Sequence, residues 1–173
     1  SDPVISEKQI IPYDQTTIEK RGDVLVYTTS SLKNDLEVTG PVKVLLFASS
    51  TAKNTDFTAK LVDVYPDGRA MRICEGIIRA SYRNSNEKPT NIEPGKIYKY
   101  TIDLWATSNL FKAGHQMRVE ISSSNFPRFD RNLNTGNYSA TDTTIVIAKQ
   151  IIYHDKNYPS CIVLPIIEKT DSN

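Results

Sequence analysis

Short runs of alternating apolar and polar residues recur along the chain, and they indicate β-strands with one buried face. Residues 98–104 and 115–122 alternate most cleanly, while residues 24–29 form a β-branched and aromatic run. Residues 42–48 are apolar on both faces, which is typical of a strand between two packed layers. The remaining strands are expected at residues 57–65, 69–82, 143–154 and 161–167.

Glycine and proline predict where these strands turn. The sequence Pro66-Asp67-Gly68 has the chemistry of a tight hairpin turn, because proline presets φ and glycine accepts a left-handed backbone. Proline cannot donate a hydrogen bond into a central ladder, so Gly40-Pro41 predicts a bend or a bulge.

Two further departures from regular strands are expected. We expect Gly76 to interrupt the strand at residues 69–82. Residues 105–114 are interpreted as a short crossing between two strands, with Trp105 and Phe111 as plugs over one end of the core.

The pattern as a whole predicts an all-β fold. Nowhere do apolar residues recur at helical spacing over the roughly ten to twelve residues that a helix needs. We expect a jelly-roll-like two-sheet β sandwich of the galactose-binding-domain-like kind rather than a closed barrel. Residues 1–22 are interpreted as a linker or wrapping arm, residues 23–168 as the sandwich, and residues 169–173 as a polar tail.

The loop at residues 122–137 is the most unusual stretch, because it combines aromatic, charged and amide side chains directly after a strand. A loop held in this way often carries a binding or docking surface. The alternative is a solvated turn whose Asn and Asp side chains bond their own backbone. The sequence leaves both interpretations open.

Charge and cysteine content exclude several partners. The 173 residues carry 21 Lys and Arg against 20 Asp and Glu, a net charge of +1, so neither nucleic acid nor an anionic membrane is expected as a partner. No apolar run approaches the roughly 20 residues of a membrane span.

Cys74 and Cys161 are predicted to be two buried thiols rather than a disulfide. Two free thiols suit a bacterial cytoplasm and are also compatible with export to the periplasm or medium.

The chemistry of a catalytic centre is missing from the chain. No glycine is followed two positions later by serine, so the Gly-x-Ser-x-Gly nucleophile elbow is absent. His115 is expected at the core or its edge rather than in a triad with Ser122, Ser123 or Ser124. Two histidines and widely spaced aspartates predict no metal, and the lack of a glycine-rich phosphate loop predicts no cofactor.

A carbohydrate-binding module is the alternative from a different functional class. Jelly rolls often present aromatic rings and amides to sugars, and Phe129, Tyr138, Asn132 and Asn134 could serve in this way. Such a module would stand free of any hydrolase.

Collinear stretches of the chain resemble the carboxy-terminal domain of acyl hydrolases of the X-Pro dipeptidyl-peptidase and cocaine-esterase (CocE/NonD) type. They span residues 23–167 in order. The matching stretches include residues 23–28, 36–42 and 55–64, Pro66-Asp67-Gly68-Arg69-Ala70, Ala113-Gly114-His115, Ser122-Ser123-Ser124-Asn125-Phe126-Pro127, Asp130-Arg131-Asn132 and Leu164-Pro165-Ile166-Ile167. One departure is that the family has a longer glycine-rich segment before the position of Asp14-Gln15, so no substrate contact is carried over from that segment.

The resemblance implies a non-catalytic β-sandwich domain of a serine hydrolase. It implies that nucleophile, acid and histidine lie in a preceding α/β-hydrolase domain, which is the expected partner, and that this chain alone is inactive. An apolar patch left uncovered would favour a homo-oligomer. The loop then becomes a candidate docking element, whose candidate binding or domain-interface residues are Phe126, Arg128, Phe129, Asp130, Arg131 and Asn132.

Overall fold

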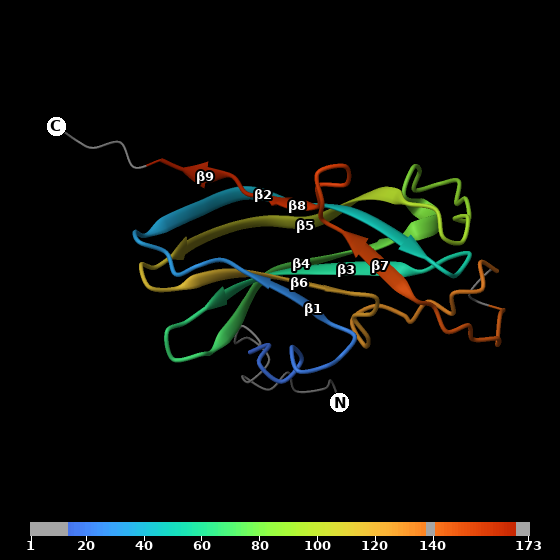
Figure 1. Cartoon of the computed structure of the whole chain (residues 1–173), viewed down its shortest axis with the longest axis horizontal. Coiled ribbons are helices and arrows are strands. Elements are labelled where there is room, and N and C mark those ends of the chain that lie inside the picture. Colours follow the sequence, from blue (N-terminus) through green and yellow to red (C-terminus); the bar gives the residue numbers. More distant parts are fainter. Residues whose placement is uncertain (1–13, 138–140, 169–173) are drawn as a thin grey trace, which may run out of the picture.

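The computed structural model describes residues 14–137 and 141–168, and in them the chain forms nine strands (Figure 1). A short 3-10 turn, η2 (Ala80–Tyr82), follows the fourth strand. The strands are β1 (Leu25–Thr28), β2 (Leu36–Ser50), β3 (Asp56–Val64), β4 (Ala70–Arg79), β5 (Tyr98–Phe111), β6 (Gln116–Ser122), β7 (Gln150–Tyr153), β8 (Cys161–Val163) and β9 (Ile166–Ile167).

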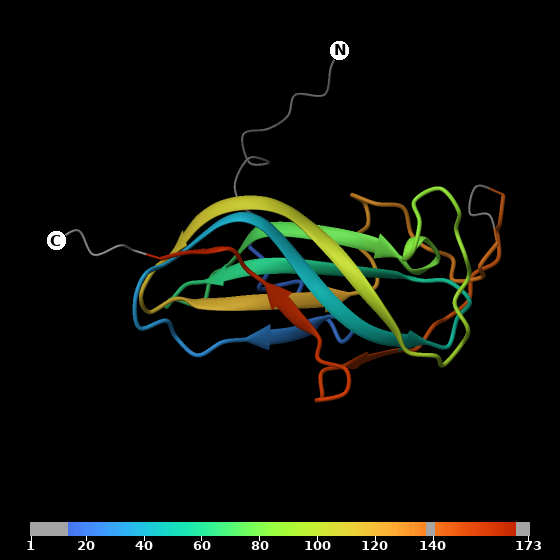
Figure 2. The same cartoon turned by 90° about the horizontal axis from the view of Figure 1, so that it is seen from above.

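The strands build two antiparallel sheets packed face to face. One sheet has the order β1-β6-β3-β4, and the other has the order β5-β2-β7, with β8 and β9 also paired to β2. Figure 2 shows the long, curved strands β2 and β5 crossing over the strands of the first sheet. The predicted all-β sandwich is therefore confirmed.

The core lies between the two sheets and follows the alternation of their strands. Phe57 and Leu61 on β3 face Leu46 on β2 and Tyr100 and Ile102 on β5, and all five are almost fully buried. Each side chain of this size contributes about 1.5–3 kcal/mol when it leaves water. Burial also raises the pKa of the Tyr100 hydroxyl to about 12.

The sandwich is closed along the edge where β4 meets β5. Gly76 on β4 lies so near β5 that a Cβ atom built on it would be 1.9 Å from the backbone oxygen of Asp103. Glycine is needed here for close approach of two backbones. The expected interruption at Gly76 was wrong, because β4 continues through this residue and remains paired with β3.

The opposite edge of the sandwich is open. Here β1 and β7 have only four residues each, and the long strand expected at residues 143–154 was wrong, since pairing begins at Gln150. Leu25 and Tyr27 lie opposite the inward-facing Ile121 and Val119, yet they are 45% and 39% exposed. The inner face of the first sheet is thus partly uncovered along this edge.

A bulge in β5 holds the single tryptophan of the chain. Lys43 pairs with Asp103 while Pro41 pairs with Ala106, so β5 has one more residue than β2 at this point. The irregularity expected near Pro41 is therefore confirmed. The expected crossing was wrong, because β5 continues to Phe111, which is buried as predicted, whereas Trp105 is 73% exposed and has a φ of 68°.

Replacing Trp105 tests the strain at this bulge. A left-handed backbone costs a non-glycine residue about 1–2 kcal/mol, and a β-branched residue suffers most. We expect Trp105→Gly to leave the free energy of unfolding unchanged or slightly higher, and Trp105→Val to lower it by about 1 kcal/mol. Urea unfolding of both variants measures this, and equal stabilities for glycine and valine would contradict it.

Both cysteines are free thiols, as expected, but only Cys74 is shielded from solvent. Burial raises the pKa of Cys74 to about 11, whereas Cys161 on β8 is exposed. The predicted burial of Cys161 was wrong because β8 pairs with β2 on one side only.

Across residues 14–137 and 141–168, no helix has the length and apolar character to span a membrane.

Candidate functional site

A layer of buried charges lies on the outer face of the first sheet, where solvent would be expected. Since Phe57 and Leu61 point inward, Asp56 and Lys60 on the same strand point outward, and they are only 2% and 7% exposed. Glu75 on β4 is 4% exposed and pairs in register with Lys60. Buried charges of this kind require partners, and the chain segments that cover this face supply them.

The loop at residues 122–137 is fastened to this layer through Glu75. Asn125 Nδ2 donates to Glu75 Oε2 at 2.8 Å, and Arg72 Nη1 donates to Glu75 Oε1 at 2.7 Å. Arg128 Nη1 also donates to Glu75 Oε1. Three donors therefore converge on one buried carboxylate, and two of them belong to the loop.

A second anchor of the loop is Asp56. Asn132 Nδ2 donates to Asp56 Oδ1 at 2.7 Å, and Arg79 makes a two-pronged contact with the same carboxylate at 2.9 and 3.2 Å. The hydrogen bond to Asp56 raises the pKa of Arg79. Of the candidate docking residues, Arg128 and Asn132 thus bond within the domain itself.

The other candidate residues present their side chains outward to different degrees. Phe126 is 56% exposed, and the guanidinium carbon of Arg131 lies 4.3 Å from the centre of its ring. Phe129 is half-buried beside Arg128, with 5.6 Å between guanidinium carbon and ring centre, and Asp130 is exposed. Phe126 and Arg131 form the part of the loop that is best placed to meet another surface.

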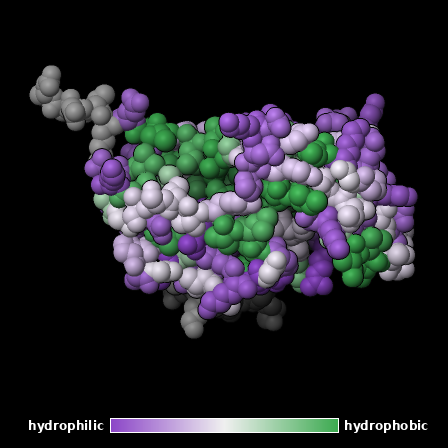
Figure 3. All heavy atoms as spheres, viewed as in Figure 1, coloured by the Kyte–Doolittle hydropathy of each residue, from purple (hydrophilic) through white to green (hydrophobic). Residues whose placement is uncertain are grey.

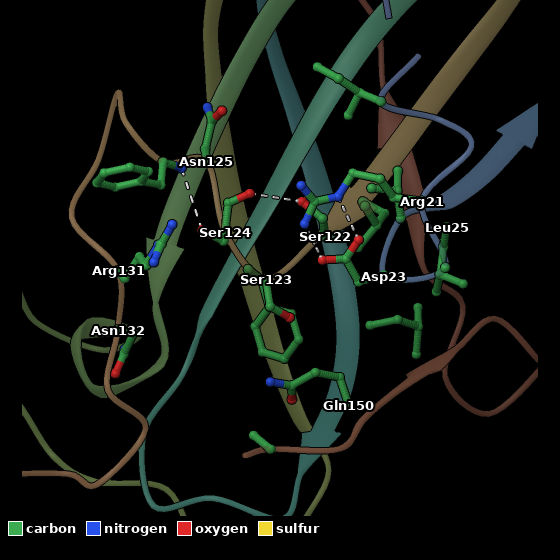
Figure 4. Close-up of a pocket in the computed structure, with 18 of the residues that line it drawn as sticks. Arg21, Asp23, Leu25, Ser122, Ser123, Ser124, Asn125, Arg131, Asn132 and Gln150 are labelled. Carbon is green, nitrogen blue, oxygen red and sulfur yellow. Dashed lines mark hydrogen bonds and ion pairs between the residues drawn. The ribbon is translucent and has the colours of Figure 1, made fainter. Parts of the chain in front are cut away.

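A cavity of about 680 Å³ lies between this loop and residues 18–25 (Figure 4). Arg21 and Asp23, joined by two hydrogen bonds of 2.8 and 2.6 Å, stand on one side, and Arg131 and Asn132 stand on the other. Gln150 at the start of β7 closes a third side. The size is that of a site for a small ligand or for a side chain of a partner.

Apolar side chains gather on the open edge beside this cavity. Ile147 is 91% exposed, Ile145 is 74% exposed and Ile151 is 54% exposed, and Leu25, on β1 of the other sheet, lines the cavity. The ring centroids of Tyr27, on β1, and His154, directly after β7, are 5.7 Å apart, so this pair connects the two sheets across the edge. Figure 3 shows several apolar areas on this face of the molecule. We call this surface the open face.

His115 is held away from the serines of the loop. Its Nδ1 lies 2.9 Å from Asp63 Oδ1, and its ring packs 4.4 Å from that of Tyr65. His115 precedes β6, whereas Ser122 ends it, which separates them by about 20 Å. A catalytic triad of these residues is therefore excluded. Among the described residues, no group of three or more His, Cys, Asp or Glu could hold a metal ion.

Residues 14–22 contribute to the second wall of the cavity, which the sequence did not reveal. They were interpreted as part of a linker or wrapping arm, and Gln15 among them is fully buried, with its Oε1 accepting from Lys60 Nζ at 2.7 Å. Tyr138, a candidate for sugar binding, lies outside the described residues.

Residues 3–163 match the family described as the X-Pro dipeptidyl-peptidase C-terminal non-catalytic domain. The chain belongs to this family. A curated relative of this non-catalytic domain is the cocaine esterase of Rhodococcus sp. (strain MB1 Bresler), with 51% identity over 160 residues that cover 91% of this chain and 28% of the esterase.

Two solved structures resemble this non-catalytic domain closely. An α-amino acid ester hydrolase matches with a TM-score of 0.85 and 30% identity, and an aminopeptidase from the marine sediment archaeon Thaumarchaeota archaeon matches with a TM-score of 0.83 and 31% identity. Each match covers 91% of this chain and 28% of the solved chain. The chain therefore spans less than a third of the length of these similar proteins.

Proposed function

We propose that this non-catalytic domain is the carboxy-terminal part of a serine hydrolase acting on esters or X-Pro peptides, and that it packs on an α/β-hydrolase domain and helps to form the substrate pocket. The observation that carries the proposal is the open face, an apolar surface at an edge where the described residues of the sandwich leave the core partly uncovered. Relatives whose names describe esterases and peptidases support the general class.

The open face has the composition of a permanent interface between domains. Ile145, Ile147 and Ile151 are exposed, and Leu25 and Tyr27 on β1 are partly uncovered. Large apolar side chains exposed in such number mark an interaction site on a protein that is otherwise well packed. Its burial against a second domain would complete the core that β1 and β7 leave open.

The loop and the cavity supply the polar part of the proposed interface. Because Glu75 and Asp56 anchor the loop, Phe126 and Arg131 are held in a fixed position at the rim. A rigid aromatic ring beside an arginine is a frequent centre of binding energy at interfaces. We infer that this pair meets the catalytic domain and borders its substrate pocket.

Activity measurements separate the proposed role from an independent enzyme. We expect the purified chain to give no turnover of a nitrophenyl ester or of an X-Pro arylamide, and the full-length protein to hydrolyse at least one of them. Serine-dependent hydrolysis by the chain alone would contradict the proposal, as would an inactive full-length protein that is folded.

A substitution on the open face tests the docking itself. Burial of one isoleucine contributes about 1.5–3 kcal/mol, so Ile147→Asp should lower the melting temperature and the kcat/KM of the full-length protein. In the isolated chain the same change should alter the free energy of unfolding by less than about 0.5 kcal/mol, because Ile147 is 91% exposed. Leu110→Asp on β5, at an exposed position of the closed edge, is the matched control and should leave kcat/KM unchanged.

The carbohydrate-binding alternative loses support from the contacts of its candidate residues. Asn132 Nδ2 donates to Asp56, and Asn134 Nδ2 donates to the backbone oxygen of Val146 at 2.9 Å. Phe129 is half-buried beside Arg128. These amides bond acceptors inside the domain and do not form a free platform for a sugar.

A further inference from the structure

Two glutamates face each other where residues 14–22, which we call the strap, cross the outer face of the first sheet. Glu19 lies on the strap and Glu120 on β6, and their side chains are 11% and 2% exposed. Glu19 Oε1 and both carboxylate oxygens of Glu120 are buried without a hydrogen-bond donor among the described residues. A buried acceptor without a donor is costly, so three in one place require an explanation.

The nearest lysine satisfies Glu120 only in part. Lys60 Nζ lies 2.7 Å from Gln15 Oε1 but 3.4 Å from Glu120 Oε2, so its close hydrogen bond is made to the glutamine. Glu75, which lies opposite Lys60 on β4, is engaged by the arginines of the loop anchor. Lys60 therefore offsets part of the charge of Glu120 and leaves its hydrogen bonding incomplete.

The nearest arginine, Arg118, is paired with Glu19 and not with Glu120. Arg118 Nη1 donates to Glu19 Oε2 at 2.5 Å, and Arg118 Nε donates to Thr28 Oγ1 at 2.8 Å. Glu120 lies two residues after Arg118 on the same face of β6, so this pairing brings Glu19 beside Glu120, and a hydrogen bond between the two carboxyl groups contributes to the raised pKa of Glu120. Two carboxylates can be joined in this way only if one of them carries a proton.

We propose that Glu19 and Glu120 share one proton, and that this proton holds the strap against the sheet as a pH-sensitive latch. With the proton present, a carboxyl group of one residue donates to the carboxylate of the other, and two of the three unpartnered oxygens are satisfied. Without it, two negative charges face each other in a buried place. The Glu19 end of the strap is then released.

Two other carboxyl groups on and next to the strap have lowered pKa values. The pKa of Asp14 is lowered by the backbone N–H of Thr16, and the pKa of Asp23 is lowered by the hydrogen bond from Arg21, so both stay ionised. The pKa of Glu120 is raised to about 7, first by burial and then by the neighbouring Glu19, against the attraction of Lys60.

The latch holds the strap more strongly at low pH, because the pKa of Glu120 is raised when the strap is closed. A carboxyl group whose pKa is raised in the closed state binds its proton more tightly there than in the open state. Closure is therefore fully stabilised below the ordinary carboxyl pKa of 4.5 and weakens as pH rises to about 7. Most carboxylates in folded proteins have lowered pKa values and stabilise the fold as pH rises. A closure that weakens with rising pH is therefore distinguishable from their effect.

Release of the strap would alter the cavity described above. Ile18, Arg21 and Asp23 line the wall of the cavity on this side. Ile18 immediately precedes Glu19 in the sequence, and the other two follow it by two and four residues. The other end of the strap remains attached through the backbone, because Gln15 N–H donates to the Ala70 oxygen at 2.7 Å. The latch thus moves one wall of the cavity and leaves the sheet in place.

Amide hydrogen exchange on the chain tests the latch. The reporter is the N–H of Glu19, which donates to the Gln15 oxygen at 2.9 Å, and the internal control is the N–H of Gln15. After correction for intrinsic exchange, we expect opening at Glu19 to increase more than about tenfold between pH 5 and pH 8, with little change at Gln15. Glu120→Gln, which keeps the shape of the protonated acid, should abolish the increase.

A second measurement keeps the test decisive if the variant does not fold. Carbon-13 NMR of the glutamate carboxyls in the unmodified chain should show Glu120 titrating with a pKa of about 7, well above the exposed Glu93, whose pKa is lowered by the hydrogen bond from Lys96. Titration of Glu120 at the ordinary carboxyl pKa would overturn the proposal. So would an increase in exchange that persists in Glu120→Gln, or one that Glu93→Gln also removes.

Discussion

Replacing Gly76 with alanine should prevent the two sheets from closing and should cost about 3 kcal/mol or more. The added methyl group would lie 1.9 Å from the Asp103 oxygen and 2.8 Å from its carbonyl carbon, and both are backbone atoms that cannot rotate away. Relief requires β4 and β5 to separate, which opens the core around Ile102. Since small domains are stable by about 5–15 kcal/mol, the loss is a large part of the total.

Urea unfolding followed by near-ultraviolet circular dichroism measures this loss. Gly22→Ala is the matched control, because nothing lies within 4 Å of a Cβ at that position and its φ is not left-handed. It should be neutral or stabilising by about 0.4–1 kcal/mol. If Gly76→Ala unfolded at the same urea concentration as Gly22→Ala, the close approach of the two sheets would be wrong.

Replacing Glu75 with alanine should detach the loop at residues 122–137 from the sheet. Three side chains donate to the Glu75 carboxylate, whose side chain is 2% exposed, and these hydrogen bonds would be lost. Removing one partner of a buried pair costs about 3–5 kcal/mol. Because Arg72 and Arg128 are partly exposed, and water can solvate them, we expect a loss of about 2–3 kcal/mol here.

The loss at Glu75 should be accompanied by faster amide exchange in the loop, where Phe129 N–H donates to the Asn125 oxygen at 3.2 Å. Glu93→Ala is the control, because Glu93 also pairs with a basic residue, Lys96, but its side chain is 71% exposed. That change should leave the free energy of unfolding nearly unchanged, because water screens an exposed ion pair. Equal effects of the two substitutions would show that the loop does not depend on a buried anchor.

Alternation in the sequence predicted the strands that lie in the middle of each sheet. β3 and β6 bury one face against the other sheet, so their apolar period of two is strong, and the turn at Gly68 forms with the left-handed φ that glycine allows. Residues 145–148 are equally apolar, yet they belong to no strand. Hydrophobicity there reflects an exposed surface rather than a strand, and a sequence does not distinguish the two.

The loop was predicted as a site, but its anchors were not. Glu75 and Asp56 occupy outward positions of strands, which alternation assigns to solvent, and their partners Arg128 and Asn132 lie more than 50 residues away in sequence. Such pairs form only because the loop folds back over the sheet. Gly76 was misinterpreted for a similar reason, since its contact is with the other sheet and not with its neighbours in the chain.

The exposed bulge in β5 has a practical consequence for spectroscopy. Trp105 is the only tryptophan in the chain, and in the folded state its indole ring is already 73% exposed to water. Its fluorescence should therefore emit at long wavelength before denaturation and change little when the core melts. The same fluorophore would report sensitively on any molecule that covers β5, whereas the buried rings of Phe57 and Tyr100, 4.8 Å apart, are the proper probes of folding.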